Sequence, residues 1–304
     1  MFIVTFMHDC THNSLFEAKW KNWAFGVCSM LPLMATFVSF RQDHLEHHRH
    51  NRSPKDPDAF TMGGRGFLDF VLFYAYILIG GVLTIIQFTI IYPIQKFNRR
   101  SWLFHGAEIL LRIVVLGGLL VATWHLGVIS KFLSVWLIPL YIFSLLNSVR
   151  FIAEHYETPW NEEQLLGTRT TLSNPVNSFF WNNINYHIGH HVYLGVPWYN
   201  LQKLHAALLP EFVRAGAAVD SSYFRVFARA CSRGPESIEP LAVGVARTGA
   251  ELPVLPPLEA ILQDRPIQER HSVAVSSAMS SAISMAHRRF SGSEINSYQN
   301  GDHS

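Results

Sequence analysis

The chain has 304 residues, of which 49% are hydrophobic and 15% are charged, and its formal net charge at pH 7 is +2. An average soluble domain is about one quarter charged, so this composition is typical of a chain that buries apolar surface in a bilayer. The small net charge excludes the strongly basic surface of a nucleic-acid-binding protein. The three cysteines, Cys10, Cys28 and Cys231, follow neither a disulfide nor a zinc-site spacing.

The first motif of the chain is a pair of histidines, His8 and His12, spaced H-x-x-x-H. We expect this pair on a helix end, because residues four apart lie on one face of a helix. Only seven residues precede the motif, which is too short for a signal peptide. Residues 23–40 are apolar but are interrupted by Pro32, and they are barely long enough to cross a bilayer.

The second motif is H-x-x-H-H, formed by His44, His47 and His48. If the first two motifs share a metal site, the chain between them must cross the membrane an even number of times. The simplest even number is zero, so we interpret residues 23–40 as an interfacial or re-entrant helix. A polar and basic segment with a D-P-D turn at residues 56–58 follows.

Three apolar stretches predict an integral membrane protein with an all-α helical bundle. Residues 70–92 contain no Lys, Arg, Asp or Glu, and they are long enough to cross the hydrocarbon core. Residues 103–124 and 132–146 are also apolar, although the former contain Glu108 and Arg112. We therefore expect a multi-pass membrane protein.

The same parity rule leaves two arrangements of these stretches open. In one, residues 103–124 and 132–146 form a hairpin with residues 125–131 at its tip, and residues 67–92 bend back at Gly80-Gly81 without a net crossing. In the other, residues 67–92 span the membrane and residues 103–124 are peripheral. Lys96 and its neighbours make the loop between the first two stretches basic, which favours the cytosol.

His155 follows the last apolar stretch after eight further residues, and a third motif with the spacing H-x-x-H-H comes next as His187, His190 and His191. Each motif directs its imidazoles to one point, and neutral imidazole suits iron, copper, zinc and nickel. The eight motif histidines are twice the number that one structural zinc site needs, which predicts two metal ions.

Three acidic residues stand inside or beside the motifs and are candidates for holding an imidazole N–H: Asp9, Glu46 and Glu154. A solvated charge or a helix cap is the alternative role for each of them. Residues 215–304 are rich in Ser, Ala, Pro and Arg, and they have no sustained apolar period after about Ala230. We expect a mostly disordered tail over residues 213–304.

The motifs carry a resemblance to the membrane fatty acid desaturase family. They read H-D-C-T-H, H-L-E-H-H before D-P-D, R-F-I-A-E-H, and N-Y-H-I-G-H-H-V-Y-L-G-V-P-W-Y-N-L-Q-K-L-H. The match extends from His8 to about His205, within a desaturase-like domain at residues 1–212. The family normally has a hydrophobic hairpin ahead of the first motif, so the resemblance suggests that the chain is N-terminally truncated.

What the resemblance implies is a non-haem di-iron site on the cytosolic side of the helical bundle. The implied iron ligands are His8, His12, His44, His47, His48, His155, His187, His190 and His191. Some related desaturases have an asparagine four residues before the histidine that corresponds to His155, and it holds a metal-bound water. That position is Phe151 here, so a water ligand would need another residue, such as Asn147 or Asn185.

The implied activity is desaturation of a fatty acyl lipid by dioxygen, with electrons from a separate cytochrome b-type or ferredoxin-type donor. Trp181 and Tyr186 are candidates for lining an acyl tunnel, although both residue types also occupy membrane interfaces. Four basic residues around the second motif would form either a docking face for an acidic donor or the ordinary basic bias of a cytosolic loop: Arg41, Arg49, Arg52 and Lys55. The membrane would be the endoplasmic reticulum in a eukaryote or the inner membrane in a bacterium.

Three other functions remain open from the sequence. The same metal site would serve a hydroxylase or ketolase that acts on a lipid or a carotenoid. A metal transporter places its ligands inside the spans, whereas here the histidine motifs lie outside the apolar stretches. A catalytically inactive, truncated metal-binding membrane protein is the third alternative.

Overall fold

The computed structural model describes residues 2–58, 62–63, 66–160, 164–237 and 255. Within these residues the protein is helical, and its four strands form two short parallel pairs, β1 with β4 and β2 with β3. The prediction of an all-α membrane protein is confirmed. The elements in chain order are α1 (Phe2–His12), α2 (Lys19–Met30), α3 (Phe37–His50), β1 (Met62–Gly63), α4 (Phe67–Ile86), η2 (Gln87–Ile91), α5 (Tyr92–Lys96), α6 (Arg99–His125), α7 (Ile129–His155), β2 (Arg169–Thr171), α8 (Pro175–Phe180), α9 (His187–Val192), η3 (Trp198–Asn200), α10 (Leu201–Ala215), β3 (Ala218–Asp220), α11 (Tyr223–Arg233) and β4 (Glu236–Ser237).

In the part of the chain that the structure describes, three helical segments are long and apolar enough to cross a membrane: Phe67–Lys96, Arg99–His125 and Ile129–His155. Many of their large apolar side chains are exposed, for example Ile113 at 64% and Val135 at 76%. Such surfaces are stable where lipid covers them. The length, the composition and the exposure together agree with a membrane protein.

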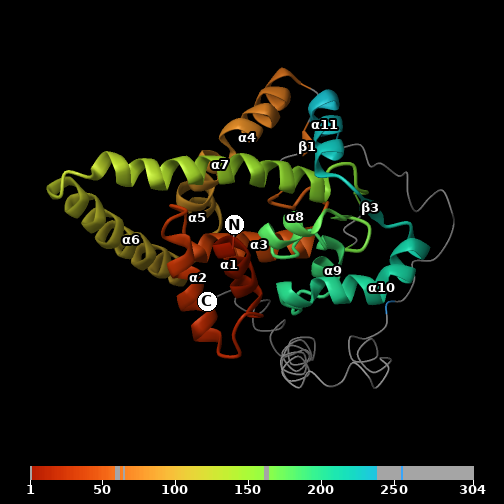
Figure 1. Ribbon diagram of the computed structural model, residues 1–304, viewed down its shortest axis with the longest axis horizontal. Coiled ribbons are helices and arrows are strands. Elements are labelled where there is room, and N and C mark those ends of the chain that lie inside the picture. Colours follow the sequence, from red (N-terminus) through yellow and green to blue (C-terminus); the bar gives the residue numbers. More distant parts are fainter. Residues whose placement is uncertain (1, 59–61, 64–65, 161–163, 238–254, 256–304) are drawn as a thin grey trace.

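Helices α6 and α7 form a long hairpin whose tip extends away from the remaining helices (Figure 1). The tip contains Gly127 at φ +67°, a backbone conformation that favours glycine, and its N–H donates to Trp124 O at 2.9 Å. This agrees with the first of the two arrangements that the sequence left open.

The segment from α4 to α5 bends near the predicted glycine pair, because Ile79 inside α4 has non-helical angles (φ −123°, ψ 20°). Both ends of the segment lie beside histidine-bearing helices. Near its start, the ring of Phe73 lies 6.4 Å from that of Tyr156, the residue after His155. Near its end, Tyr92 OH donates to Glu46 of α3 at 3.2 Å.

The prediction of one helix over residues 23–40 is wrong. The chain forms α2, turns at residues 31–34 and begins α3 at Phe37. Pro32 lies in this turn, and Met34 there has φ +61°. Trp20 on α2 is 68% exposed, as expected of a helix at a membrane surface.

The prediction of a disordered tail from residue 213 is wrong for its first part. Residues 213–237 complete α10 and then form β3, α11 and β4. Tyr223, Val226 and Ala230 of α11 are buried in the larger hydrophobic core. Arginine occurs at every fourth residue of α11, on its exposed side. The composition of this segment therefore resembles that of the polar tail, and the helix was not predicted. The rest of the predicted tail, residues 238–304, lies outside the described residues except for residue 255.

A buried carboxylate of α6 fixes the start of α3, the helix that carries the second histidine motif. The Glu108 carboxylate accepts hydrogen bonds from the backbone N–H groups of Phe37 at 2.6 Å and Val38 at 3.2 Å. Arg112, one turn further along α6, donates to the carbonyl of Ala35. An acidic group at a helix N-terminus satisfies free N–H groups and complements the helix dipole.

We predict that Glu108→Ala lowers the free energy of unfolding by about 2 kcal/mol, because two buried N–H groups lose a charged acceptor. Thermal unfolding in detergent measures the effect. Glu211→Ala is the control, since it removes only a surface ion pair with Arg214 at 3.6 Å. An equal, small shift of both midpoints would contradict the role assigned to Glu108.

Candidate metal centre

Four separate elements bring the nine candidate histidines together. Helix α1 contributes two, α3 contributes three, α7 contributes one at its C-terminus and α9 contributes three. All nine residues are buried, with at most 8% of the residue surface exposed. Helix α9 has only six residues, and its Gly189 permits close contact with α10, because a Cβ there would lie 3.3 Å from Leu204 Cδ2.

The first group, called here the five-histidine set, consists of His8, His12, His44, His48 and His190, whose candidate ligand atoms all lie within 4.8 Å of one another. His44 Nε2 lies 3.1 Å from His12 Nε2 and 3.0 Å from His48 Nε2. His48 Nε2 also lies 3.0 Å from His190 Nε2. The set therefore joins α1, α3 and α9.

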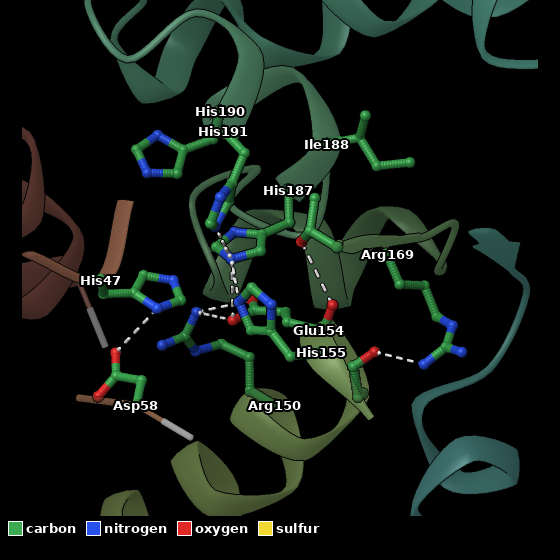
Figure 2. Close-up of polar contacts among 12 residues, drawn as sticks. His47, Asp58, Arg150, Glu154, His155, Arg169, His187, Ile188, His190 and His191 are labelled. Carbon is green, nitrogen blue, oxygen red and sulfur yellow. Dashed lines mark hydrogen bonds and ion pairs between the residues drawn. The ribbon is translucent and has the colours of Figure 1, made fainter. Parts of the chain in front are cut away.

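The second group, called here the four-histidine set, consists of His47, His155, His187 and His191, which form two overlapping clusters. His187 Nε2 lies 3.3 Å from His155 Nε2 and 3.1 Å from His191 Nε2. Figure 2 shows these imidazoles pointing toward one another from α3, α7 and α9. The carboxylate of Glu154 belongs to one of the two clusters, with His155 and His187.

These distances fit metal coordination better than hydrogen bonding. Two neutral imidazoles can share one proton, but three or more ring nitrogens facing one another leave lone pairs opposed. A metal bound at about 2.1 Å places neighbouring nitrogens at right angles about 3.0 Å apart. The residues therefore fit two metal ions, one in each set, and buried imidazoles of this kind suit a transition metal.

The Nδ1 atoms of three histidines in the four-histidine set have polar partners, so the Nε2 atoms of these rings can bind a metal. His47 Nδ1 lies 2.8 Å from Asp56 Oδ1, and His191 Nδ1 lies 3.0 Å from Gln164 Oε1. His155 Nδ1 lies 3.0 Å from the carbonyl of Gly167. Such contacts fix the tautomer and the ring orientation of metal-binding histidines.

The sequence did not assign Asp56 or Gln164 to the site. Asp56 stands in the D-P-D turn, and that motif was the available signal for it. Nothing local marks Gln164, which lies between His155 and the third motif. Its amide also donates to the carbonyl of His48 at 2.7 Å, so it joins residues of both histidine sets.

The three acidic candidates differ in what they contact. Asp9 Oδ1 lies 3.8 Å from His8 Nδ1, and its other oxygen accepts from Trp198 N at 3.1 Å. Glu46 pairs with Lys96 at 2.8 Å, so its role is structural. Glu154 Oε2 lies 3.5 Å from His187 Nε2, and Arg150 pairs with the same carboxylate (Figure 2).

The side chains of both asparagines proposed as water holders make hydrogen bonds within the protein. Asn147 Oδ1 accepts from Arg150 Nε at 3.2 Å. Asn185 Nδ2 donates to the carbonyl of Thr171 at 3.0 Å. Glu154 is the non-histidine ligand candidate that the structure groups with the histidines.

An apolar cavity of about 730 Å³ extends from the histidines between α4 and α7 to the turn after α2. Its lining includes His8 and His44 of the five-histidine set, as well as Leu83 of α4 and Leu137 of α7. Trp181 also lines this cavity, as the sequence suggested. Tyr186 does not line it, and its ring lies 5.2 Å from that of His205 instead.

Arg52 cannot contribute to the predicted basic docking face, because its side chain is only 2% exposed. It forms an ion pair with Glu236 at 2.9 Å. Lys55 and Arg49 are exposed, so the basic character of this loop is smaller at the surface than the sequence indicated.

Residues 1–223 match the family model described as Fatty acid desaturase. The sn-1 oleoyl-lipid 12-desaturase of Picosynechococcus sp. is 27% identical over 224 residues, which cover 66% of this chain and 63% of that protein. The sn-1 acyl-lipid omega-3 desaturase (ferredoxin) of Nostoc sp. is 26% identical over 240 residues, with coverages of 67% and 62%. A putative sphingolipid delta(4)-desaturase/C4-monooxygenase of Caenorhabditis elegans is 27% identical over 234 residues, with coverages of 68% and 54%. The chain thus spans less than two thirds of the length of these relatives.

We predict that His47→Ala and His190→Ala each remove one of two bound metal ions, because the two residues belong to different sets. Metal analysis of the purified protein measures this as a fall from two ions per chain to about one. His205→Ala is the control, since His205 is buried but lies outside both sets. Two ions retained in both variants would contradict the ligand assignment.

We also predict that the metal-free protein loses stability as the pH falls below about 6.5, the ordinary pKa of histidine. Burial lowers the pKa values of His8, His44, His48, His187, His190 and His191. The unfolded chain therefore binds more protons than the folded chain in this range, and acid favours unfolding.

Four groups outside the membrane-spanning segments act in the opposite direction. Burial alone would lower the pKa of His47, but Asp56 and two further carboxylates raise it to about 9, so His47 stabilises the fold below pH 6.5. Burial raises the pKa of Asp58 to about 6 and also raises the pKa values of Asp9 and Asp43, which offsets part of the loss at lower pH. We expect the six histidines to outweigh these four groups. A thermal midpoint that is unchanged or higher at pH 5.5 than at pH 7.5 would contradict the prediction.

Proposed function

We propose, from the premise that the chain belongs to the fatty acid desaturase family, that it is a membrane-bound acyl-lipid desaturase with two histidine-held irons. The convergence of nine buried imidazoles into two adjacent sets beside an apolar cavity carries this proposal. A cavity of this volume and apolar lining suits a lipid tail.

When bound, two irons supply the oxidising power with which dioxygen, two electrons and two protons become two waters, while two hydrogens leave adjacent acyl carbons. Removing hydrogen from an unactivated C–H bond requires an oxidant stronger than any side chain. The part of the protein is to hold the metals, to orient the acyl chain and to exclude water.

The nine histidines are the proposed iron ligands, in the five-histidine set and the four-histidine set. We add Glu154 to the four-histidine set. Its buried carboxylate lies 3.5 Å from His187 Nε2 and lines the cavity. Arg150, which pairs with this carboxylate at 2.6 Å, offsets its charge. A carboxylate there would take the place that the resemblance gives to a water-holding asparagine, where this chain has Phe151.

The apolar cavity is the proposed site of the acyl chain. Its lining includes histidines of both sets and, from the turn after α2, Leu33 and Met34. An acyl chain in this cavity would contact side chains of α4 and α7 along its length. The same apolar walls would keep water from the reacting carbons.

The proposed topology follows from the parity of the crossings. Because the histidines of α3, α7 and α9 converge, an even number of crossings separates them. The hairpin of α6 and α7 supplies two crossings, and the bent segment Phe67–Lys96 would lie along the membrane without a net crossing. Lys96, Arg99 and Arg100 favour the cytosolic side for the metal centre, in the endoplasmic reticulum or a bacterial inner membrane.

Electrons would come from a separate protein of the ferredoxin type or the cytochrome b type. The name of the Nostoc relative contains ferredoxin, which supports the first of these. Hydroxylation is a second candidate reaction, because the name of the nematode relative joins a desaturase to a C4-monooxygenase. The two reactions differ in whether a second hydrogen or an oxygen is transferred.

We expect that cells expressing the chain with a ferredoxin and its reductase accumulate fatty acids with one additional double bond. Gas chromatography with mass spectrometry of the lipid extract measures the new species. His190→Ala, which disrupts the five-histidine set, is the inactive control. New hydroxy fatty acids without new double bonds would favour the second candidate. An unchanged lipid profile from a chain that holds two irons would overturn both candidates.

A further inference from the structure

Residues next to the metal centre contact a segment of the chain that lies beyond the family match. The match ends at residue 223, whereas α11 and β4 continue to Ser237. Gly234 turns the chain between them at φ +76°, where its Cβ position would lie 2.4 Å from Phe70, so glycine is required. The turn is held on α7 by Tyr156, whose hydroxyl donates to the carbonyl of Gly234 at 2.8 Å.

Directly after this turn, Glu236 forms a buried, two-pronged ion pair with Arg52. Glu236 Oε1 lies 2.9 Å from Arg52 Nη2, and Glu236 Oε2 lies 3.0 Å from Arg52 Nη1. The two side chains are 4% and 2% exposed. The carboxylate also accepts from the backbone N–H of Glu157 at 2.7 Å, two residues after His155. Parallel N–H···O bonds of this kind fix both distance and orientation.

The backbone N–H of Arg52 connects this ion pair, through Asp56, to His47 of the four-histidine set. Its N–H donates to Asp56 Oδ2 at 2.8 Å, and Asp56 Oδ1 lies 2.8 Å from His47 Nδ1. Arg52 has φ +56°, a conformation that a non-glycine residue adopts when its surroundings enforce it.

The surroundings of Arg52 supply that constraint. Its guanidinium donates to the carbonyl of Thr158 at 2.7 Å and lies 3.8 Å from the ring of Trp160. Both residues belong to the loop after α7. A buried guanidinium without an anionic partner is unstable, so Glu236 is required for Arg52 to remain in this position.

We propose that Glu236 is a positioning residue for the four-histidine set, acting through Arg52 and Asp56 on His47. This inference rests on the proposed function, because it assumes a metal in that set. Glu236 also accepts from Glu157 N, so one carboxylate holds the chain beside His47 on one side and beside His155 on the other. Residues 223–237 thereby form part of the metal centre.

The test compares iron release from the wild-type chain with release from Glu236→Ala and Glu236→Gln. The full chain is loaded with two irons and mixed with a chromophoric chelator, and the two rates of release are recorded. We expect one rate to increase about 10- to 100-fold in Glu236→Ala, as for other residues that hold a ligand in place. The second rate, from the five-histidine set, should stay at the wild-type value. Glu211→Gln, in a surface ion pair, is the matched control.

Mössbauer spectra of the same samples give a readout that general destabilisation does not move. We expect a change in one of two iron signals in the Glu236 variants and none in Glu211→Gln. If Glu236→Ala does not fold, Glu236→Gln decides, since it keeps the shape and one acceptor. Wild-type rates and spectra in the folded variants would overturn the inference, as would equal acceleration of both rates. A wild-type chain that binds no iron would instead contradict the proposed function.

Discussion

The structure depends on keeping nine imidazoles buried and facing one another in a small volume. Their ring nitrogens lie about 3 Å apart, for example His190 Nε2 and His48 Nε2 at 3.0 Å. Without a metal, lone pairs of neighbouring rings repel, and protons that would relieve the repulsion are opposed by burial. No single helix presents more than three of these residues, so the fold must hold four elements in register. The surrounding polar contacts are best understood as the means by which it does so.

Charged side chains at helix ends supply much of this register. Glu108 accepts from the first N–H groups of α3, which carries three of the nine histidines. Arg169 donates to the carbonyls of Ala153 at 3.1 Å and Tyr156 at 2.7 Å, where α7 ends with His155. A carboxylate at a helix N-terminus and a guanidinium at a C-terminus both complement the helix dipole, and both come from other elements. Each of these two histidine-bearing helices is thus fixed at one end, α3 at its start and α7 beside His155, and both contacts oppose a sliding motion that would displace the imidazoles.

The sequence predicted what depends on local spacing and missed what depends on distant contacts. The H-x-x-H-H spacing places ligands on one helix face, and the uncharged run at residues 70–92 predicts a membrane segment, so both follow from helix geometry. The partner of Arg52, in contrast, is Glu236, which stands 184 residues away in the chain. An ion pair at that separation leaves no periodic pattern, and Arg52 in the sequence resembles any loop arginine. Helix α11 was missed because only a narrow face of it, with Tyr223, Val226 and Ala230, is buried in the core.

Some histidines of each set face the cavity, and the others do not. His8 and His44 of the five-histidine set line the cavity, as do three residues associated with the four-histidine set, His47, His155 and His187. The remaining four histidines do not line it and lie behind these side chains. A lipid tail bound there, as proposed, would face both proposed metal positions, which suits a reaction that removes hydrogens from adjacent carbons. Glu236 and Arg52 do not line the cavity, so the positioning role proposed for Glu236 would leave the space for the proposed substrate unchanged.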